Sequence, residues 1–173
     1  MWITPSAMFK GDLQPTMLVR VGIDGASLDE DAHSPSSEVQ MHCAVYRTRP
    51  DAHAVVHAHA PHATILVNSG TPFLPISTEA AFLGDIPRLP FIMPGTDDLA
   101  AAVAEAVRGS WAVLMGNHGL LVAGRSLRRA ADMVEIVDRS CEVILGCYAV
   151  GKAPSVLPEE VCRMLRKMGD LVA

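Results

Sequence analysis

Three histidines and one glutamate are the residues of this chain whose types and spacing could support chemistry. His57 and His59 form a His-Ala-His sequence, His118 lies in Gly-Asn-His-Gly, and Glu38 follows two serines. Because side chains alternate faces along a strand, a strand through residue 59 would put the first two imidazoles on one face, roughly 7 Å apart along the backbone. That separation allows both rings to bind one metal ion.

The His57–His59 pair also has a simpler explanation, since a single histidine on a strand is most often a half-buried polar group. Here the neighbours Ala58 and Ala60 are small and leave space around both rings. Neutral imidazole is a common protein ligand for zinc and related ions, so we favour metal binding. His53 shares the same strand face, but it would lie roughly 13 Å from His57, too far to bind the same ion.

His118 would be a third ligand only if the fold brings it beside residue 57, and its Asn-His-Gly sequence fits a turn equally well. It interrupts two apolar segments, and glycines at 116 and 119 indicate a close approach of the backbone, for example to a ligand. Three histidines with an open fourth position are typical of catalytic zinc.

Glu38 and the serines before it lie at the start of a predicted helix. A carboxylate there is stabilised by the helix dipole, so Glu38 taken alone is explained by the helix itself. The hydroxyls of Ser36 and Ser37 could cap the helix, or they could join the free N–H groups in binding an anion such as phosphate.

The remaining sequence predicts the elements that must position these residues. Strands are expected over residues 17–24, 51–59, 87–93, 111–115 and 120–123. Helices are expected from 34–37 to about 48, from 61 to 68–70, over 97–107, from 126 to about 150, and from 159 onward. This alternation, without a repeat or a dividing linker, predicts a single α/β domain over residues 1–173 with a mixed sheet.

Composition narrows the partners and the compartment. Half of the 173 residues are hydrophobic, which is enough for one substantial core. The net charge of −5, without a cluster of Lys or Arg, disfavours nucleic acid and anionic membranes as partners, so a small molecule is favoured. The four cysteines form no Cys-x-x-Cys pair, and neither a secretory leader nor an apolar stretch of about 20 residues is present, which predicts a cytoplasmic protein.

The chain resembles the class II aldolase/adducin family over nearly its whole length. Five segments in the family's order and spacing carry this resemblance: Ile3-Thr4-Pro5-Ser6, Pro35-Ser36-Ser37-Glu38, His57-Ala58-His59, Pro94-Gly95-Thr96 and Asn117-His118-Gly119-Leu120. The family implies a three-layer α/β/α fold with a central mixed β-sheet, and a homotetramer with active sites between subunits.

The resemblance also implies a role for each candidate residue. Three histidines would bind Zn²⁺, or another divalent metal such as Mn²⁺ or Co²⁺, and Glu38 would be the catalytic acid/base. Three serines would hold the substrate phosphate. The three histidines are His57, His59 and His118, and the three serines are Ser6, Ser36 and Ser37. The implied reaction is zinc-dependent carbon–carbon cleavage of a small, phosphorylated hydroxy-ketone sugar, through an enediolate that the metal stabilises.

Three departures from the family pattern bear on the reaction. Most members have a helix and a strand before the Thr-Pro segment, so we expect this chain to be short at its N-terminus. Ala7 stands where phosphate-binding members have glycine, and Thr78 stands where the aldolases have a proton-donating tyrosine. Decarboxylation of a β-keto acid therefore stays open as an alternative, and so does a non-catalytic, adducin-like scaffold. The scaffold is disfavoured because burying four unused polar groups would be costly.

Overall fold

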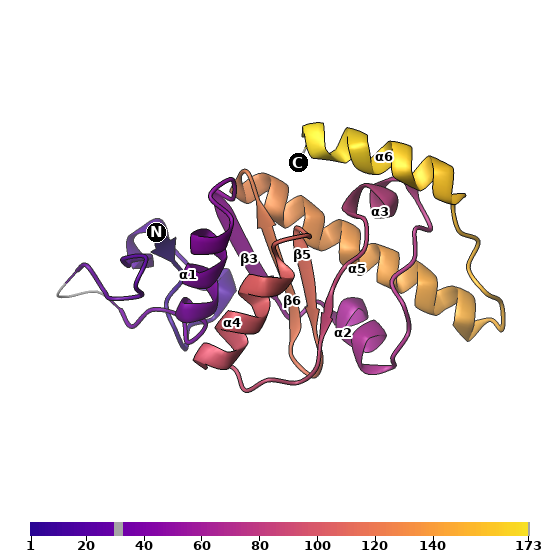
Figure 1. The fold of residues 1–173 in the computed structure, drawn as a ribbon. Coiled ribbons are helices and arrows are strands. Elements are labelled where there is room, and N and C mark those ends of the chain that lie inside the picture. The colour runs from indigo at the N-terminus through magenta and orange to yellow at the C-terminus, as the bar shows by residue number, and fades with distance from the viewer. Residues whose placement is uncertain (30–32, 173) are drawn as a thin grey trace.

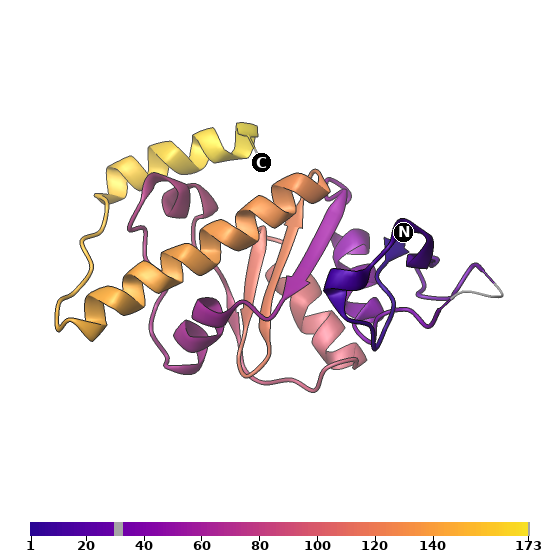
Figure 2. The ribbon, with the colours of Figure 1, turned by 180° about the vertical axis from the view of Figure 1, so that it is seen from behind.

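A mixed four-stranded sheet forms the centre of the molecule. The computed structural model describes residues 1–29 and 33–172, and Figures 1 and 2 show this sheet between layers of helices. Its strands are ordered β3 (Ala54–Ala58), β6 (Gly119–Gly124), β5 (Ala112–Met115) and β4 (Arg88–Leu89). β6 is antiparallel to both of its neighbours, whereas β4 and β5 are parallel. The predicted three-layer α/β/α fold with a central mixed sheet is confirmed.

Each face of the sheet has its own core because successive residues of a strand point to opposite faces. Val113 and Met115 pack with apolar residues of α1 (Val39–Thr48) and α4 (Asp97–Ala106). Leu114, between them, packs on the opposite face with residues that belong to α2 and α5. Every residue of β5 and β6 is buried, as expected for strands covered on both faces.

A short helix, α2, and a long helix, α5, cover the second face of the sheet. α2 (Pro61–Asn68) directly follows the segment that carries two of the candidate ligands, and α5 (Leu127–Ala149) runs across the sheet (Figure 2). α3 (Thr78–Leu83) and α6 (Glu159–Val172) lie beside one another beyond α5 (Figure 1). Within residues 1–29 and 33–172, no helix combines the length and the apolar character that crossing a bilayer requires.

The N-terminal segment forms a small separate unit against the start of α1. β1 (Trp2–Ile3) pairs antiparallel with β2 (Val19–Arg20), and two short 3₁₀ turns, Lys10–Asp12 and Pro15–Met17, lie between them. Ile3, Val19 and Val21 are buried together, with Val39 of α1 packed against them. The strand predicted over residues 17–24 is therefore much shorter than expected.

Two other predicted boundaries were wrong. Residues 34–36 are extended rather than helical, because Ser36 N–H donates to the Thr4 carbonyl at 3.0 Å and Ser6 N–H donates to the Ser34 carbonyl at 2.9 Å. α1 consequently begins only at Val39. The strand predicted over 87–93 is reduced to β4, where Pro90 has no N–H to continue the ladder.

Candidate metal centre

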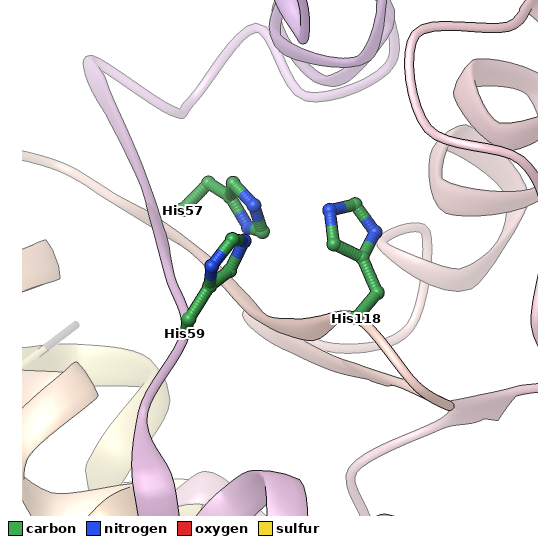
Figure 3. Close-up of side chains that lie close together, drawn as sticks. All are labelled: His57, His59 and His118. Carbon is green, nitrogen blue, oxygen red and sulfur yellow. The ribbon is translucent and has the colours of Figure 1, made fainter. Parts of the chain in front are cut away.

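The structure brings the three candidate histidine ligands together, as Figure 3 shows. His57 lies in β3, His59 directly follows the last residue of that strand, which is shorter than the predicted 51–59, and His118 comes from the loop between β5 and β6. One ligand nitrogen from each ring lies within 4.8 Å of the other two. The ring centroids are 4.7 to 5.5 Å apart, and the rings are tilted or edge-on rather than stacked. Three imidazoles in this arrangement could hold one metal ion.

Hydrogen bonding leaves a ring nitrogen of His57 free for that ion. Its Nδ1 lies 3.0 Å from the carbonyl oxygen of Leu120, so Nδ1 carries the proton and donates it. Its Nε2 is buried and has no hydrogen-bond partner among the residues that the structure describes. A buried lone pair without a partner is costly, and a metal ion would satisfy it. The Nδ1–H is held by a backbone carbonyl, as is common for histidines that bind metals.

The same surroundings keep the imidazoles neutral. Burial, with smaller contributions from the neighbouring His118 and His59, lowers the pKa of His57 to about 4. Burial also lowers the pKa of His118, against the opposing effect of the Glu38 carboxylate. Because only the neutral ring binds a metal, both side chains are in the ligand form at neutral pH.

The loop that presents His118 depends on two unusual backbone positions. Asn117 has a φ of 53°, in the left-handed region that asparagine tolerates better than most residues. At Gly119, a Cβ atom would lie 2.6 Å from the carbonyl oxygen of Ala58 and 3.1 Å from Cδ2 of His59. The close approach predicted here is therefore made to the backbone of β3 and to a candidate ligand ring.

Glu38 is buried at the start of α1 without making a capping hydrogen bond. It occupies the N-cap position of α1, but its side chain makes no capping hydrogen bond. The residue is only 6% exposed, and its Oε2 is buried without a hydrogen-bond partner among the described residues. Its negative charge raises the pKa of His118, so the two groups interact electrostatically. A capping hydrogen bond therefore does not explain this residue, although the helix dipole favours its charge.

The candidate phosphate-binding serines lie on the extended segments before α1. The ladder between residues 4–6 and 34–36 places Ser6 and Ser36 on neighbouring segments. The Ser36 hydroxyl accepts a hydrogen bond from the Glu38 N–H at 3.3 Å, which leaves its own O–H free to donate. Ser37 is exposed. Ala7 has a φ of 55°, a conformation that glycine adopts more easily.

Several residues that shape the site carry no recognisable sequence signal. Asn68 at the end of α2 accepts a hydrogen bond from the Asn117 N–H, and Asp138 of α5 accepts from the first amides of α2. These pairs are separated by 49 to 76 positions, so no local pattern could reveal them. Thr78, in the tyrosine position, is exposed at the start of α3, and its hydroxyl donates to Glu79 at 3.1 Å.

Comparison with known proteins gives consistent matches. Residues 1–145 match the family described as Class II Aldolase and Adducin N-terminal domain. A 5-deoxy-D-ribulose 1-phosphate aldolase of Bacillus thuringiensis is 32% identical over 95% of this chain and 77% of its own length. A 3-oxo-tetronate 4-phosphate decarboxylase of Escherichia coli is 34% identical, over 87% and 72% respectively. A solved L-fuculose 1-phosphate aldolase superposes with a TM-score of 0.90 at 31% identity, over 98% of this chain and 80% of that one.

Proposed function

We propose that this chain, a metal-dependent lyase that belongs to the class II aldolase and adducin family, cleaves a carbon–carbon bond in a small phosphorylated ketose. The observation that carries the proposal is the set of three converging histidines, together with a buried Glu38 carboxylate oxygen that has no hydrogen-bond partner among the described residues and whose charge acts on His118. A catalytic metal site needs ligands and a group that moves protons, and here the two occur together.

The residues present fit a divalent metal ion. His57, His59 and His118 would hold it, and we propose Zn²⁺ because three histidines with an open position suit catalytic zinc, with Mn²⁺ and Co²⁺ as alternatives. When bound, the cation supplies a Lewis acid that stabilises negative charge on the substrate's carbonyl oxygen.

Glu38 is the residue we propose for proton transfer. A carboxylate oxygen without a hydrogen-bond partner is available to take a proton from a substrate hydroxyl as the carbon–carbon bond breaks. The same group can return the proton to the carbon of the fragment that keeps the phosphate. Because Glu38 is buried, few water molecules compete with the substrate for this proton.

The phosphate group is proposed to bind at the start of α1. The hydroxyls of Ser6, Ser36 and Ser37 would donate hydrogen bonds to its oxygens, and the positive end of the α1 dipole would favour its negative charge. The names of the three similar proteins support a phosphorylated substrate, since each includes a phosphate ester.

Decarboxylation of a phosphorylated 3-oxo acid is the second candidate. Thr78 favours it, because a threonine hydroxyl is too weak an acid to replace the proton donor of related aldolases, a tyrosine that exchanges a proton with the oxygen that becomes the aldehyde. Loss of CO₂ needs no such proton donor. The decarboxylase named above, which is as similar to this chain as the aldolases are, gives the same support.

We further propose that the chain is a cytoplasmic homotetramer with active sites between subunits. Phe91 lines a cavity of about 320 Å³ together with Gly116 and Asn117, directly before His118. Phe91 and Met93 are 52% and 61% exposed, so an apolar surface lies next to the site, where a second subunit could cover it. Light scattering coupled to size-exclusion chromatography would measure the mass in solution.

A direct assay separates the two reactions. The metal-loaded protein would be incubated with ketose 1-phosphates and with a 4-phosphorylated 3-oxo acid. Aldol cleavage of a ketose 1-phosphate releases an aldehyde and dihydroxyacetone phosphate, whereas decarboxylation of the 3-oxo acid releases CO₂ and a phosphorylated ketone, so the aldehyde and CO₂ are the products that distinguish the two reactions. We expect one of these products at a rate at least 100-fold above that of the His57→Ala variant. Equal, background rates for both proteins with every substrate would contradict the proposed function.

A further inference from the structure

Helix α2 connects the two chain segments that carry the candidate ligands. It begins two residues after His59, and its last residue, Asn68, reaches the loop that carries His118. The side-chain Oδ1 of Asn68 accepts a hydrogen bond from the backbone N–H of Asn117 at 2.7 Å. The helix therefore touches the metal centre from both of its ends.

The first end of α2 is fixed by a residue from another helix. Ala60, at the N-cap position, provides no side-chain hydrogen bond, and Pro61 has no N–H. Asp138 of α5 fills this role: its Oδ1 accepts from the N–H groups of His62 and Ala63 at 2.8 and 2.9 Å. Its other oxygen lies 2.9 Å from Nδ1 of His62. The segment after His59 is thus attached to α5.

The middle of α2 and its second end are also fixed by contacts with the rest of the chain. Ala63, Leu66 and Val67 are buried in the core against the sheet. The Arg88 guanidinium, at the start of β4, donates to the Val67 carbonyl at 3.1 Å and to the carbonyls of Gly70 and Thr71 at 3.2 Å. Because the helix is fixed at both ends, its last residue, Asn68, has a defined position from which its side chain can restrain the Asn117 backbone.

The Asn117 loop needs such a support. Its left-handed φ is uncommon for residues other than glycine, and Asn117 is exposed, so few packing contacts restrain it. A rotation about the Asn117 backbone would move His118, the next residue, relative to the other two rings. The hydrogen bond from Asn117 to Asn68 opposes that rotation.

We propose that Asn68 is a positioning residue for the metal centre, which fixes the Asn117 loop and so sets the distance of His118 from His57 and His59. This inference rests on the proposed function in that the three histidines bind the metal. Asn68 itself contacts neither the metal nor the substrate, and it acts through the backbone of the neighbouring loop.

The test compares Asn68→Ala with Asn68→Asp, which keeps an acceptor oxygen at the same place. Metal affinity would be measured by competition with a chromophoric chelator, and ligand geometry by the visible absorption spectrum of the Co²⁺-loaded protein. We expect Asn68→Ala to bind metal about tenfold more weakly and to have a changed Co²⁺ spectrum. Asn68→Asp should restore both to within about twofold of the wild type. Ile65→Ala, which removes an exposed side chain one turn earlier, is the control and should change neither.

A measurement on the unaltered protein keeps the inference testable if Asn68→Ala does not fold. Hydrogen exchange of the wild-type Asn117 amide should be clearly slower than expected for an exposed loop amide, and an unprotected amide would overturn the inference. Wild-type affinity and spectrum in Asn68→Ala would overturn it as well, while leaving the proposed function in place. If the wild-type protein itself bound no metal, both would be wrong.

Discussion

Replacing Gly119 by alanine tests whether the end of β3 and the His118 loop are built around their close contact. The added Cβ would lie 2.6 Å from the carbonyl oxygen of Ala58, well below the 3.4 Å at which ordinary van der Waals contact begins. It would also lie 3.1 Å from Cδ2 of His59. The first neighbour is backbone and cannot move by itself, so the two strands must separate locally.

The cost of this separation can be estimated from the packing around it. Gly119 is buried and paired with Met115, so the strain cannot be relieved toward solvent. Overpacking a buried position in this way costs about 1–3 kcal/mol of unfolding free energy. Since the ring of His59 must shift as well, metal affinity should fall by about tenfold or more.

Two assays with a matched control decide the outcome. Urea unfolding of the metal-free protein gives the stability, and chelator competition gives the metal affinity. Gly146→Ala is the control, because a Cβ there meets no heavy atom within 4 Å. Gly146 lies inside α5, where alanine in place of glycine should raise the unfolding free energy by about 1 kcal/mol. Wild-type stability and metal affinity in Gly119→Ala would refute the packing described for this loop.

Three further predictions concern Glu38, Ala7 and the histidine pKa values. Glu38→Gln should keep wild-type metal content and lower kcat by about 10²–10⁴-fold, and an unchanged kcat would remove the acid/base role. Ala7→Gly should leave the unfolding free energy unchanged or raise it by up to about 1 kcal/mol, because φ at Ala7 is 55°. The control Ala131→Gly, inside α5, should lower the unfolding free energy by about 1 kcal/mol, with both values measured by urea unfolding. The pKa of His57 is about 4 in the folded chain and about 6.5 when unfolded, so the unfolded state binds more protons between these values. Metal-free protein should therefore lose stability as the pH falls from 6.5 toward 4, and His57→Asn should weaken this dependence in urea midpoints measured at several pH values.

Much of the fold follows from local sequence patterns. The apolar segments that became β5 and β6, the helix start at Pro61 and the serine cap at Ser126 were all predicted close to their observed positions. The paired histidines were found for the same reason, since two positions on one strand face are a local relation. The fourth residue, Glu38, gained a role only from the resemblance to a family, because its local position was explained equally well by a helix.

The parts that sequence did not predict depend on contacts between distant segments. The register of β3 on β6, with Ala58 opposite Leu120, is what brings His118 to the other rings. The late start of α1 comes from pairing between residues 4–6 and 34–36, and this pairing overrides the local signal for a helix start at 34–37. The bond from Asn117 to Asn68 is equally non-local. Hydrophobic periodicity contains no information about such partners.

Metal content per subunit, measured by elemental mass spectrometry on wild type and His57→Ala side by side, tests the central claim most directly. We predict close to one divalent ion per wild-type subunit, with zinc favoured, and near-complete loss in the variant. A wild-type protein that takes up no metal even after reconstitution, or a His57→Ala variant that keeps its full metal content, would contradict the three-histidine centre.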